Sequence, residues 1–208
     1  GGPNFGKGMA SSVLKDKGHA HVDSGDYMRN RLKKDESFQG KHGDVINKGF
    51  FIPDDAVNEC FEDMFKIHKV THQSKIVMDG LFRTGPQFHY GLQVLSKFGL
   101  KPVFIELHHV SRELAWERAK ERAQKQGRMD DLDEEVFLRR FGLYHVHYAD
   151  VFAQIRKREM CFHKIRADQK LEDVQADVRR IFNRYDPVAS VRRECELNAV
   201  QPERGCGC

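Results

Sequence analysis

The 208 residues carry 35 basic and 31 acidic side chains, a formal net charge of +4, and a hydrophobic fraction of 39% that includes 15 Phe. This size and composition suit one compact domain with its own buried core. The mild charge, without a basic stripe interleaved with aromatic residues, argues against a nucleic-acid partner. No apolar stretch approaches the roughly 20 residues that span a bilayer.

The first residues form a glycine-rich loop. Gly1 is followed by four residues and then by Gly6-Lys7, the spacing of a phosphate-binding loop. Backbone N–H groups in such a loop turn toward the phosphates, the following helix adds its positive N-terminal end, and Lys7 supplies a mobile charge. Gly8 stands where most such loops have Ser or Thr. Such loops normally follow a buried strand, so we expect the first strand of the sheet to be missing from this chain because the sequence is cropped at its front.

Short apolar runs alternate with helical patterns along the rest of the chain. In the first half we expect helices over 9–17, 27–34 and 54–68, strands over 20–22 and 75–79, a polar connection over 35–42 and an extended segment over 50–53. Asp54 and Asp55 are expected to cap the helix that they begin. In the second half we expect helices over 87–98, 111–126, 133–158 and 171–182, strands over 102–107 and 161–165, and a loop over 127–131. From Tyr185 onward the periodicity is lost, which predicts disorder.

The alternation of strands and helices predicts an α/β fold with a parallel, doubly wound sheet. Ligands bind such a sheet at the carboxyl ends of its strands. The loop 1–8, the turn at 24–26 and Asp79, which ends a strand, are therefore expected to meet at one edge.

The five cysteines show no spacing typical of a metal site. Cys60 and Cys161 lie in apolar surroundings, so we expect buried thiols and a reducing, cytoplasmic location. The terminal Cys206-Gly207-Cys208 resembles a double-cysteine lipidation signal, but no polybasic run accompanies it. We expect no membrane partner, with lipidation of Cys206 or Cys208 as the open alternative, and we expect a monomer. The eleven histidines are assigned to the surface or to packing.

Five motifs in order resemble those of the adenylate kinases, of the nucleoside monophosphate kinase family, over residues 1–183. They are GGPNFGKGM at 1–9, DSGDYMR at 23–29, KGFFIPD at 48–54, DGLFRTGPQ at 79–87 and GRMDD at 127–131. Arg139 follows at the family's spacing. The resemblance implies a P-loop parallel sheet flanked by helices, with a helical monophosphate-binding flap at 30–53, a short lid at 123–131 and a disordered tail at 184–208.

The resemblance also implies reversible phosphoryl transfer from Mg-ATP to AMP, giving two ADP. Such catalysis is mostly positioning and charge stabilisation, and the planar fork of arginine grips phosphate bidentately. The implied catalytic residues are Lys7, Arg83, Arg128 and Arg139. ATP would contact Gly2, Asn4, Phe5, Gly6, Lys7, Gly8, Met9, Arg118, Arg122 and Lys170. AMP would contact Ser24, Arg29, Phe50, Phe51, Ile52, Gly80, Arg83, Gln87, Arg128 and Arg139.

Three further roles follow from the same resemblance. Asp79 would orient Mg²⁺ through water molecules, since the loop offers no hydroxyl ligand. Gln87 would read an edge of the adenine. Asp130 and Asp131 would form ion pairs that hold the lid closed.

Four departures from the family pattern keep alternatives open. Asn4 and Phe5 replace small residues of the loop, Met9 replaces a hydroxyl side chain, and Phe82 replaces a proline. These changes would suit a nucleotide-binding pseudoenzyme, and the acceptor could also be UMP or CMP. The retained lysine and arginines favour an enzyme, and the motif at 84–87 favours adenine.

Overall fold

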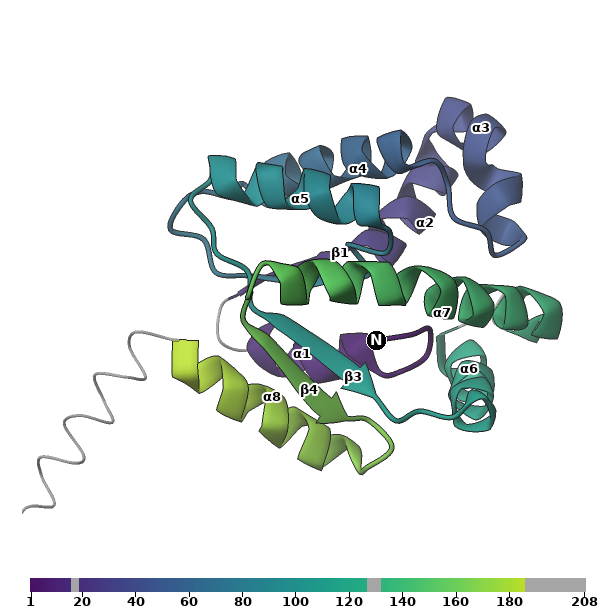
Figure 1. Cartoon of the computed structure of the whole chain (residues 1–208). Helices are drawn as coiled ribbons and strands as arrows, with labels where there is room; N and C mark the ends of the chain where they lie inside the picture. Colours follow the sequence, from purple (N-terminus) through teal and green to yellow (C-terminus); the bar gives the residue numbers. More distant parts are fainter. Residues whose placement is uncertain (16–18, 127–131, 186–208) are drawn as a thin grey trace, which may run out of the picture.

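The computed structural model describes residues 1–15, 19–126 and 132–185, and strands alternate with helices along them (Figure 1). In chain order the elements are α1 (Lys7–Lys15), β1 (Ala20–Asp23), α2 (Ser24–Lys34), α3 (Glu36–Asn47), α4 (Asp54–Ile67), β2 (Ile76–Asp79), α5 (Gly85–Lys97), β3 (Phe104–His108), α6 (Arg112–Gln126), α7 (Glu134–Lys157), β4 (Phe162–Arg166) and α8 (Leu171–Tyr185). The predicted α/β class is confirmed, and so is the parallel direction of the strands.

The sheet is small and consists of two parallel pairs. β1 pairs with β2 in a register that sets Asp23 opposite Asp79, and β3 pairs with β4. Among the described residues β2 and β3 are not bonded to each other. The strands of both pairs are short, with four or five residues each.

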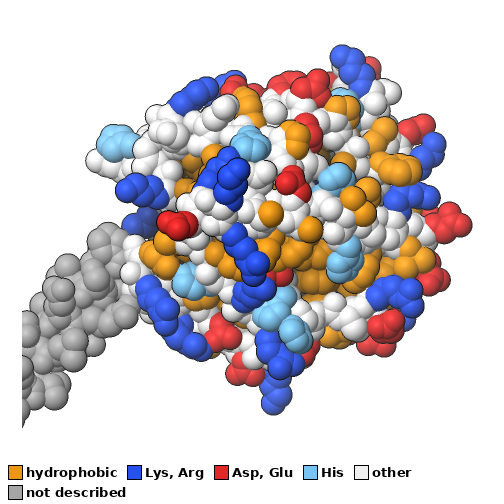
Figure 2. Space-filling view, viewed as in Figure 1, with side chains coloured by type: hydrophobic (Ala, Val, Ile, Leu, Met, Phe, Trp, Pro, Cys, Tyr) orange, Lys and Arg blue, Asp and Glu red, His pale blue; other side chains and the backbone are white. Residues whose placement is uncertain are grey.

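Helices cover the strands on both sides. α8 packs against α1 and β4, and α5 packs against α4 and α7. The largest apolar cluster joins α1, β3, α6, α7 and α8, and it includes Leu14, Leu107, Phe137 and Val178. In the same view as Figure 1, apolar side chains gather across the middle of the molecule with Lys, Arg and His side chains around them (Figure 2).

Side-chain caps fix where several helices begin. Asp23 accepts the N–H of Asp26 at 2.9 Å, so α2 starts directly at the end of β1. Thr84 does the same for α5 by accepting the N–H of Gln87. The helices are thereby anchored at the strand ends where the candidate site lies.

Three local predictions were wrong. Residues 35–42 are not a connection, because Asp35 accepts the N–H of Phe38 at 2.9 Å and starts α3, whose Phe38 is buried. Asp54 does not cap α4, which begins after Pro53 without a side-chain cap. Cys161 is exposed and directly precedes β4, whereas Cys60 is buried as predicted.

Other predictions fall partly outside the described residues. α8 runs to Tyr185, past its predicted end, and the rest of the predicted tail at 184–208 lies beyond the part that the structure describes. The same is true of the loop at 127–131, with Arg128, Asp130 and Asp131 in it. No helix in the described ranges is both long and apolar enough to cross a membrane.

Candidate functional site

The glycine-rich loop turns directly into α1. Asn4 and Gly6 take positive φ angles of 59° and 85°, a region that Asn tolerates better than most residues and glycine tolerates freely. The substitution at Asn4 is therefore compatible with the turn, although its buried Oδ1 has no hydrogen-bond partner. Phe5 is only 4% exposed and packs against Phe141 and Tyr144 of α7, with ring centroids 6.2 and 5.6 Å apart.

The side chain of Lys7 folds back into the glycine-rich loop that precedes it. Its Nζ donates a hydrogen bond to the carbonyl oxygen of Gly2 at 2.7 Å. Burial lowers the pKa of Lys7 to about 8, and the nearby carboxylate of Asp79 opposes this shift. The positive charges of Arg83 and Arg122 also act on Lys7. The ammonium group is thus held among other cations, an arrangement that favours a polyanionic ligand.

The rest of the loop leaves room beside Lys7. A Cβ on Gly8 would lie 3.8 Å from Oδ2 of Asp79, so position 8 approaches the end of β2 without a side chain. Met9 points outward and is 52% exposed. The first hydroxyl of α1 is that of Ser11, which donates to the carbonyl oxygen of Gly8 at 3.1 Å and shares a hydrogen bond with His21.

Two carboxylates meet at the carboxyl ends of β1 and β2. Asp23 and Asp79 are register partners, and His21 lies two residues before Asp23, on the same face of the strand. One ligand atom from each of His21, Asp23 and Asp79 lies within 4.8 Å of the others. Mg²⁺ prefers carboxylate oxygens and keeps several of its waters, so Asp23 and Asp79 fit this ion. The imidazole of His21 would suit a transition metal better.

Arg83 lies beside the same strand end. Its Nε donates to the carbonyl oxygen of Gly80 at 2.6 Å, and its guanidinium lies 5.7 Å from the ring of Phe51. The charges of Asp79, Asp23, Arg29 and Arg140 act on it.

Gly80 must be glycine for this arrangement. It has φ of 75°, and a Cβ there would lie 2.6 Å from Oγ of the buried Ser24 and 2.9 Å from Nη2 of Arg83. The turn after β2 therefore places Arg83 only because position 80 has no side chain.

Phe82 stands where the family pattern has a proline, and it takes a left-handed backbone that proline cannot adopt. It has φ of 59°, and its ring packs among Phe61, Phe88 and Phe104, with centroids 5.8 to 6.1 Å away. Gly91 of α5 makes space for it, because a Cβ there would lie 2.1 Å from the ring. Phe82 thus anchors the turn by packing.

The residues predicted to contact AMP include a short extended segment and its neighbours. The guanidinium of Arg139 lies 4.6 Å from the ring of Phe50 and donates to the carbonyl oxygen of Lys48. Phe50 is 47% exposed, whereas Ile52 is buried in the core cluster of α2, α3 and α4, so only its backbone can face a ligand. Arg29 forms an ion pair with Asp26 in the first turns of α2.

Both polar atoms of Gln87 have partners in the structure. Its Nε2 donates to Oδ1 of Asp54 at 2.8 Å, and its Oε1 accepts the N–H of Arg83 at 3.0 Å. Thr84 donates to the same oxygen of Asp54 at 2.9 Å. These bonds fix the orientation of the amide, which has a second N–H donor and a second acceptor lone pair for a ligand.

The two arginines predicted to contact ATP, Arg118 and Arg122, lie on α6. Arg118 donates to the carbonyl oxygen of Ala167 at 2.7 Å, which ties α6 to the segment before α8. Arg122, one turn further, is near enough for its charge to act on Lys7. Lys170 is exposed and directly precedes α8. The structure thus brings Arg122 to the loop, whereas Arg118 is turned toward the start of α8.

Three residues of the site were not found from the sequence. His21 and Asp23 join Asp79, and their spacing of two on a predicted strand could have indicated a shared face. Arg140, rather than Arg139, is the α7 arginine whose charge acts on Arg83. The sequence could not distinguish Arg139 from Arg140 in this role, because the rotation of α7 about its axis determines which of the two side chains faces Arg83.

Comparisons with known proteins show which sequences the chain resembles. The family model of the AAA domain matches residues 1–138. The chain is similar to the adenylate kinase of Tropheryma whipplei (strain Twist), with 26% identity over 185 residues that cover 88% of this chain and 95% of that protein. It is 28% identical over 150 residues to the adenylate kinase of Parabacteroides distasonis, covering 72% of this chain and 77% of that protein. It is also 26% identical over 183 residues to UMP-CMP kinase 1 of Oryza sativa subsp. japonica, covering 88% and 71% of the two chains.

Proposed function

Because the chain belongs to the AAA domain family and is homologous to the adenylate kinases, we propose that it transfers a phosphoryl group reversibly from Mg-ATP to AMP, giving two ADP. More generally, the chain is a nucleoside monophosphate kinase, like these relatives. The observation that carries the proposal is the meeting of Lys7 and Arg83 beside Asp79 at the carboxyl end of β2.

ATP binds at the loop in this proposal. The backbone N–H groups of residues 2–8 and the N-terminal end of α1 surround its outer phosphates. Lys7 leaves the carbonyl oxygen of Gly2 and takes a phosphate oxygen instead, while Arg122 adds a second positive charge from α6. Arg118, one turn before Arg122 on α6, and Lys170, just before α8, also contact the donor in this proposal.

AMP binds on the other side of Asp79. Arg83 and Arg29 hold its phosphate, and Arg139 reaches the transferring group from α7, together with Arg128. The adenine lies against Phe50 and Phe51, whose rings already contact arginine side chains. Several planar guanidinium groups spread around one phosphoryl group stabilise the charge that develops in transfer.

Mg²⁺ would be held by Asp79 and Asp23, through its water molecules. When bound, the ion would supply charge neutralisation for the outer phosphates. The residues of the chain position those phosphates: Lys7 from the loop and Arg83 from the turn after β2.

Closure would exclude water from the reacting groups. Residues 30–53, which contain α3 and the extended segment after it, form the acceptor flap in this proposal, and residues 123–131 form the lid. The monomeric state and the cytoplasmic location stay predictions.

A pyrimidine monophosphate is the alternative acceptor, because a UMP-CMP kinase is among the similar proteins. Gln87 decides between the two in this proposal. Its amide can both donate to and accept from an adenine edge, because Asp54 and the N–H of Arg83 occupy one position each on Nε2 and Oε1.

The proposal is tested by measuring phosphoryl transfer from Mg-ATP to AMP, UMP, CMP and GMP. Lys7→Met and Arg83→Ala should each lower kcat/KM for AMP by about 10²-fold or more, because each removes a charge aimed at the transferring group. Lys15→Met at the exposed end of α1 and Arg112→Ala at the exposed start of α6 are the matched controls and should retain wild-type rates.

Each result has a distinct meaning. ADP formation with AMP alone, lost in both site variants, supports the adenylate kinase. Preferential transfer to UMP or CMP moves the proposal to the pyrimidine acceptor. Binding of ATP without transfer to any acceptor overturns the enzyme and leaves a nucleotide-binding pseudoenzyme.

A further inference from the structure

A histidine and two aspartates form a cluster on one face of β1 and β2. His21 and Asp23 lie two residues apart on β1, and Asp79 is the register partner of Asp23 on β2. All three side chains therefore point to the same face of the strand pair. Each offers one ligand atom, and the three atoms lie within 4.8 Å of one another. α1 packs against both strands, and its Ser11 contacts His21, so the cluster lies between the strand pair and this helix.

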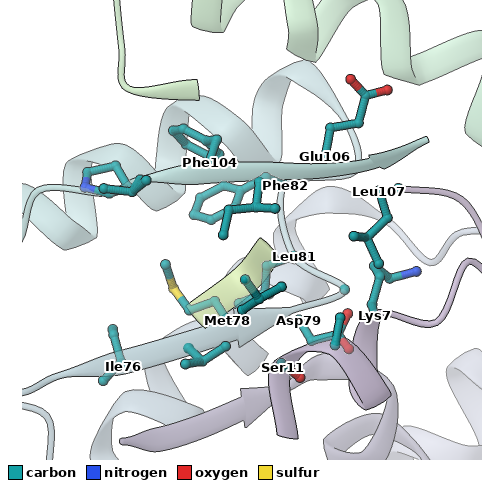
Figure 3. Close-up of a pocket in the computed structure, with 18 of the residues that line it drawn as sticks. Lys7, Ser11, Ile76, Met78, Asp79, Leu81, Phe82, Phe104, Glu106 and Leu107 are labelled. Carbon is teal, nitrogen blue, oxygen red and sulfur yellow. The ribbon is translucent and has the colours of Figure 1, made fainter. Parts of the chain in front are cut away.

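The carboxylate of Asp79 is buried without a hydrogen-bond partner. Asp79 is only 9% exposed, and no donor in the described part of the chain bonds to its oxygens. It lies beside Ser11 and Lys7, and all three line a cavity of about 660 Å³ between β2 and β3 (Figure 3). Lys7 and Arg83 act on Asp79 through their charge. Since buried carboxylates are normally hydrogen-bonded, paired at close range or bound to a metal, Asp79 points to a cationic ligand.

The hydrogen bonds of His21 leave one ring nitrogen for a metal. Oγ of Ser11 donates to the carbonyl oxygen of Gly8 at 3.1 Å and lies 3.2 Å from Nε2 of His21. Because the hydroxyl proton goes to Gly8, Nε2 carries the proton of the second bond, and Nδ1 keeps its lone pair. A histidine that binds a metal commonly gives its other ring N–H to an oxygen in this way.

Asp23 adds a carboxylate that the family pattern lacks. The motif DSGDYMR at 23–29 has Asp23 where the resembling adenylate kinase motif has serine. Oδ1 of Asp23 accepts the N–H of Asp26 at 2.9 Å and caps α2, which leaves Oδ2 for an ion. A serine could form the same cap, so the cap does not explain the second carboxylate.

The nitrogen ligand and the neighbouring cations together favour one class of ion. The charges of Lys7 and Arg83 oppose a dication that is held by charge alone. Mg²⁺ prefers oxygen ligands and keeps several of its waters, so it gains little from an imidazole. First-row transition metals bind imidazole and carboxylate together more strongly. The set of one nitrogen and two carboxylates therefore suits a transition metal better than Mg²⁺.

We propose that His21, Asp23 and Asp79 bind a first-row transition-metal dication directly, in preference to Mg²⁺, with water at the remaining positions. Bonds of about 2.1 Å set ligand atoms at most about 4 Å apart around one ion, so a side-chain shift of less than about 1 Å closes the set. The site goes beyond the proposed phosphoryl transfer, in which Asp79 and Asp23 would hold Mg²⁺ only through water. The two ions compete, because they share these carboxylates.

The test titrates the full chain with Mn²⁺ in the absence of nucleotide and follows free Mn²⁺ by electron paramagnetic resonance. Mn²⁺ is the probe because thiolates select softer ions, so the five cysteines bind it poorly. We expect one Mn²⁺ per chain. In competition, Mg²⁺ should bind at least about tenfold more weakly than Mn²⁺.

Two variants remove ligands but keep the local hydrogen bonds. His21→Gln can still donate to Ser11, and Asp23→Ser can still cap α2. Each should weaken Mn²⁺ binding at least about tenfold, and His21→Gln should also abolish the preference for Mn²⁺ over Mg²⁺. His72→Gln and Asp44→Ser change exposed residues outside the cluster and are the matched controls, which should bind Mn²⁺ as the wild type does.

A spectroscopic measurement on the wild type keeps the test informative if a variant folds poorly. Electron spin echo modulation of the bound Mn²⁺ should show a nitrogen bonded directly to the ion. This signal should be absent from His21→Gln and present in His72→Gln. A role of His21 in packing alone would give no such signal.

Several outcomes would overturn the proposal. One is the absence of saturable Mn²⁺ binding to the wild type. Another is binding without the nitrogen signal and with unchanged affinity in His21→Gln, which would place the ion on carboxylates alone. A third is equal affinity for Mn²⁺ and Mg²⁺. The titrations contain no nucleotide, so their failure is distinguishable from a failure of the kinase proposal.

Discussion

At the scale of single residues, Lys7 has a partner before any nucleotide arrives. Its ammonium donates to the carbonyl oxygen of Gly2, within the same loop. The bond keeps the side chain folded back over the turn, so the loop is already shaped around a positive charge. Binding a phosphate then needs one exchange of hydrogen-bond acceptors and no ordering of a mobile chain.

The lowered pKa of Lys7 predicts how ATP affinity depends on pH. In the free protein this pKa is about 8, below the ordinary 10.5. A bound polyphosphate favours the protonated form, so affinity is greatest below pH 8 and falls above it, by up to about tenfold per pH unit. Calorimetry of ATP binding between pH 7 and 9.5 measures this. Lys15→Met should behave as the wild type, and a decline that persists unchanged in Lys7→Met would contradict the assignment.

Residue types and spacing predicted which charged residues form the site, but they did not predict the hydrogen-bond partners of those residues and of Gln87. Lys7, Arg83 and Asp79 lie together as the motifs indicated. Gln87, in contrast, is held by Asp54, to which the sequence analysis gave no role beyond capping a helix. That bond joins two helices 33 positions apart in the chain, and local patterns carry no information on such a pairing.

At the scale of elements, α5 has a glycine where the turn that precedes it needs space. Gly91 stands in the interior of this helix, where glycine costs roughly 0.5–1 kcal/mol relative to alanine. The ring of Phe82 occupies the space that a side chain would need. The weaker helix residue is therefore required by packing against the turn that carries Arg83.

Two glycine substitutions should have opposite effects. Gly91→Ala would set a Cβ 2.1 Å from the ring of Phe82, so we expect a loss of about 1–3 kcal/mol in unfolding free energy. Gly142→Ala in α7 meets no atom within 4 Å and should gain about 0.5–1 kcal/mol from helix propensity. Urea unfolding measures both. A stabilising Gly91→Ala would show that Phe82 does not need this space.

Helices and strands were predicted well where the apolar period was clear and poorly where it was not. α3 was missed because Gly40 and Gly43 lower its helix propensity and its first residues are polar. The buried Phe38 and the cap at Asp35 outweigh this weakness. Tertiary burial decided that element, and burial is not visible in a local window.

At the scale of the whole molecule, α1 and α8 join the two strand pairs, because α1 packs against β1 and β2 and α8 packs against α1 and β4. The order of the strands in the sheet could not be predicted from the sequence. The alternating pattern predicted parallel strands, and the two pairs confirm this. Nothing in the apolar runs states which strand lies beside which, because all of the strands are short and only partly buried. The cavity between β2 and β3 became apparent only from the spatial arrangement.

The ring of Phe5 has a consequence for communication between the two substrates. It rests on Phe141 and Tyr144, so the donor loop is in contact with α7, the helix that also carries Arg139 and Arg140. A rotation of α7 toward an acceptor phosphate would move the surface on which the loop rests. The affinity for one nucleotide then depends on occupancy by the other, and thermodynamic linkage makes this dependence equal in both directions.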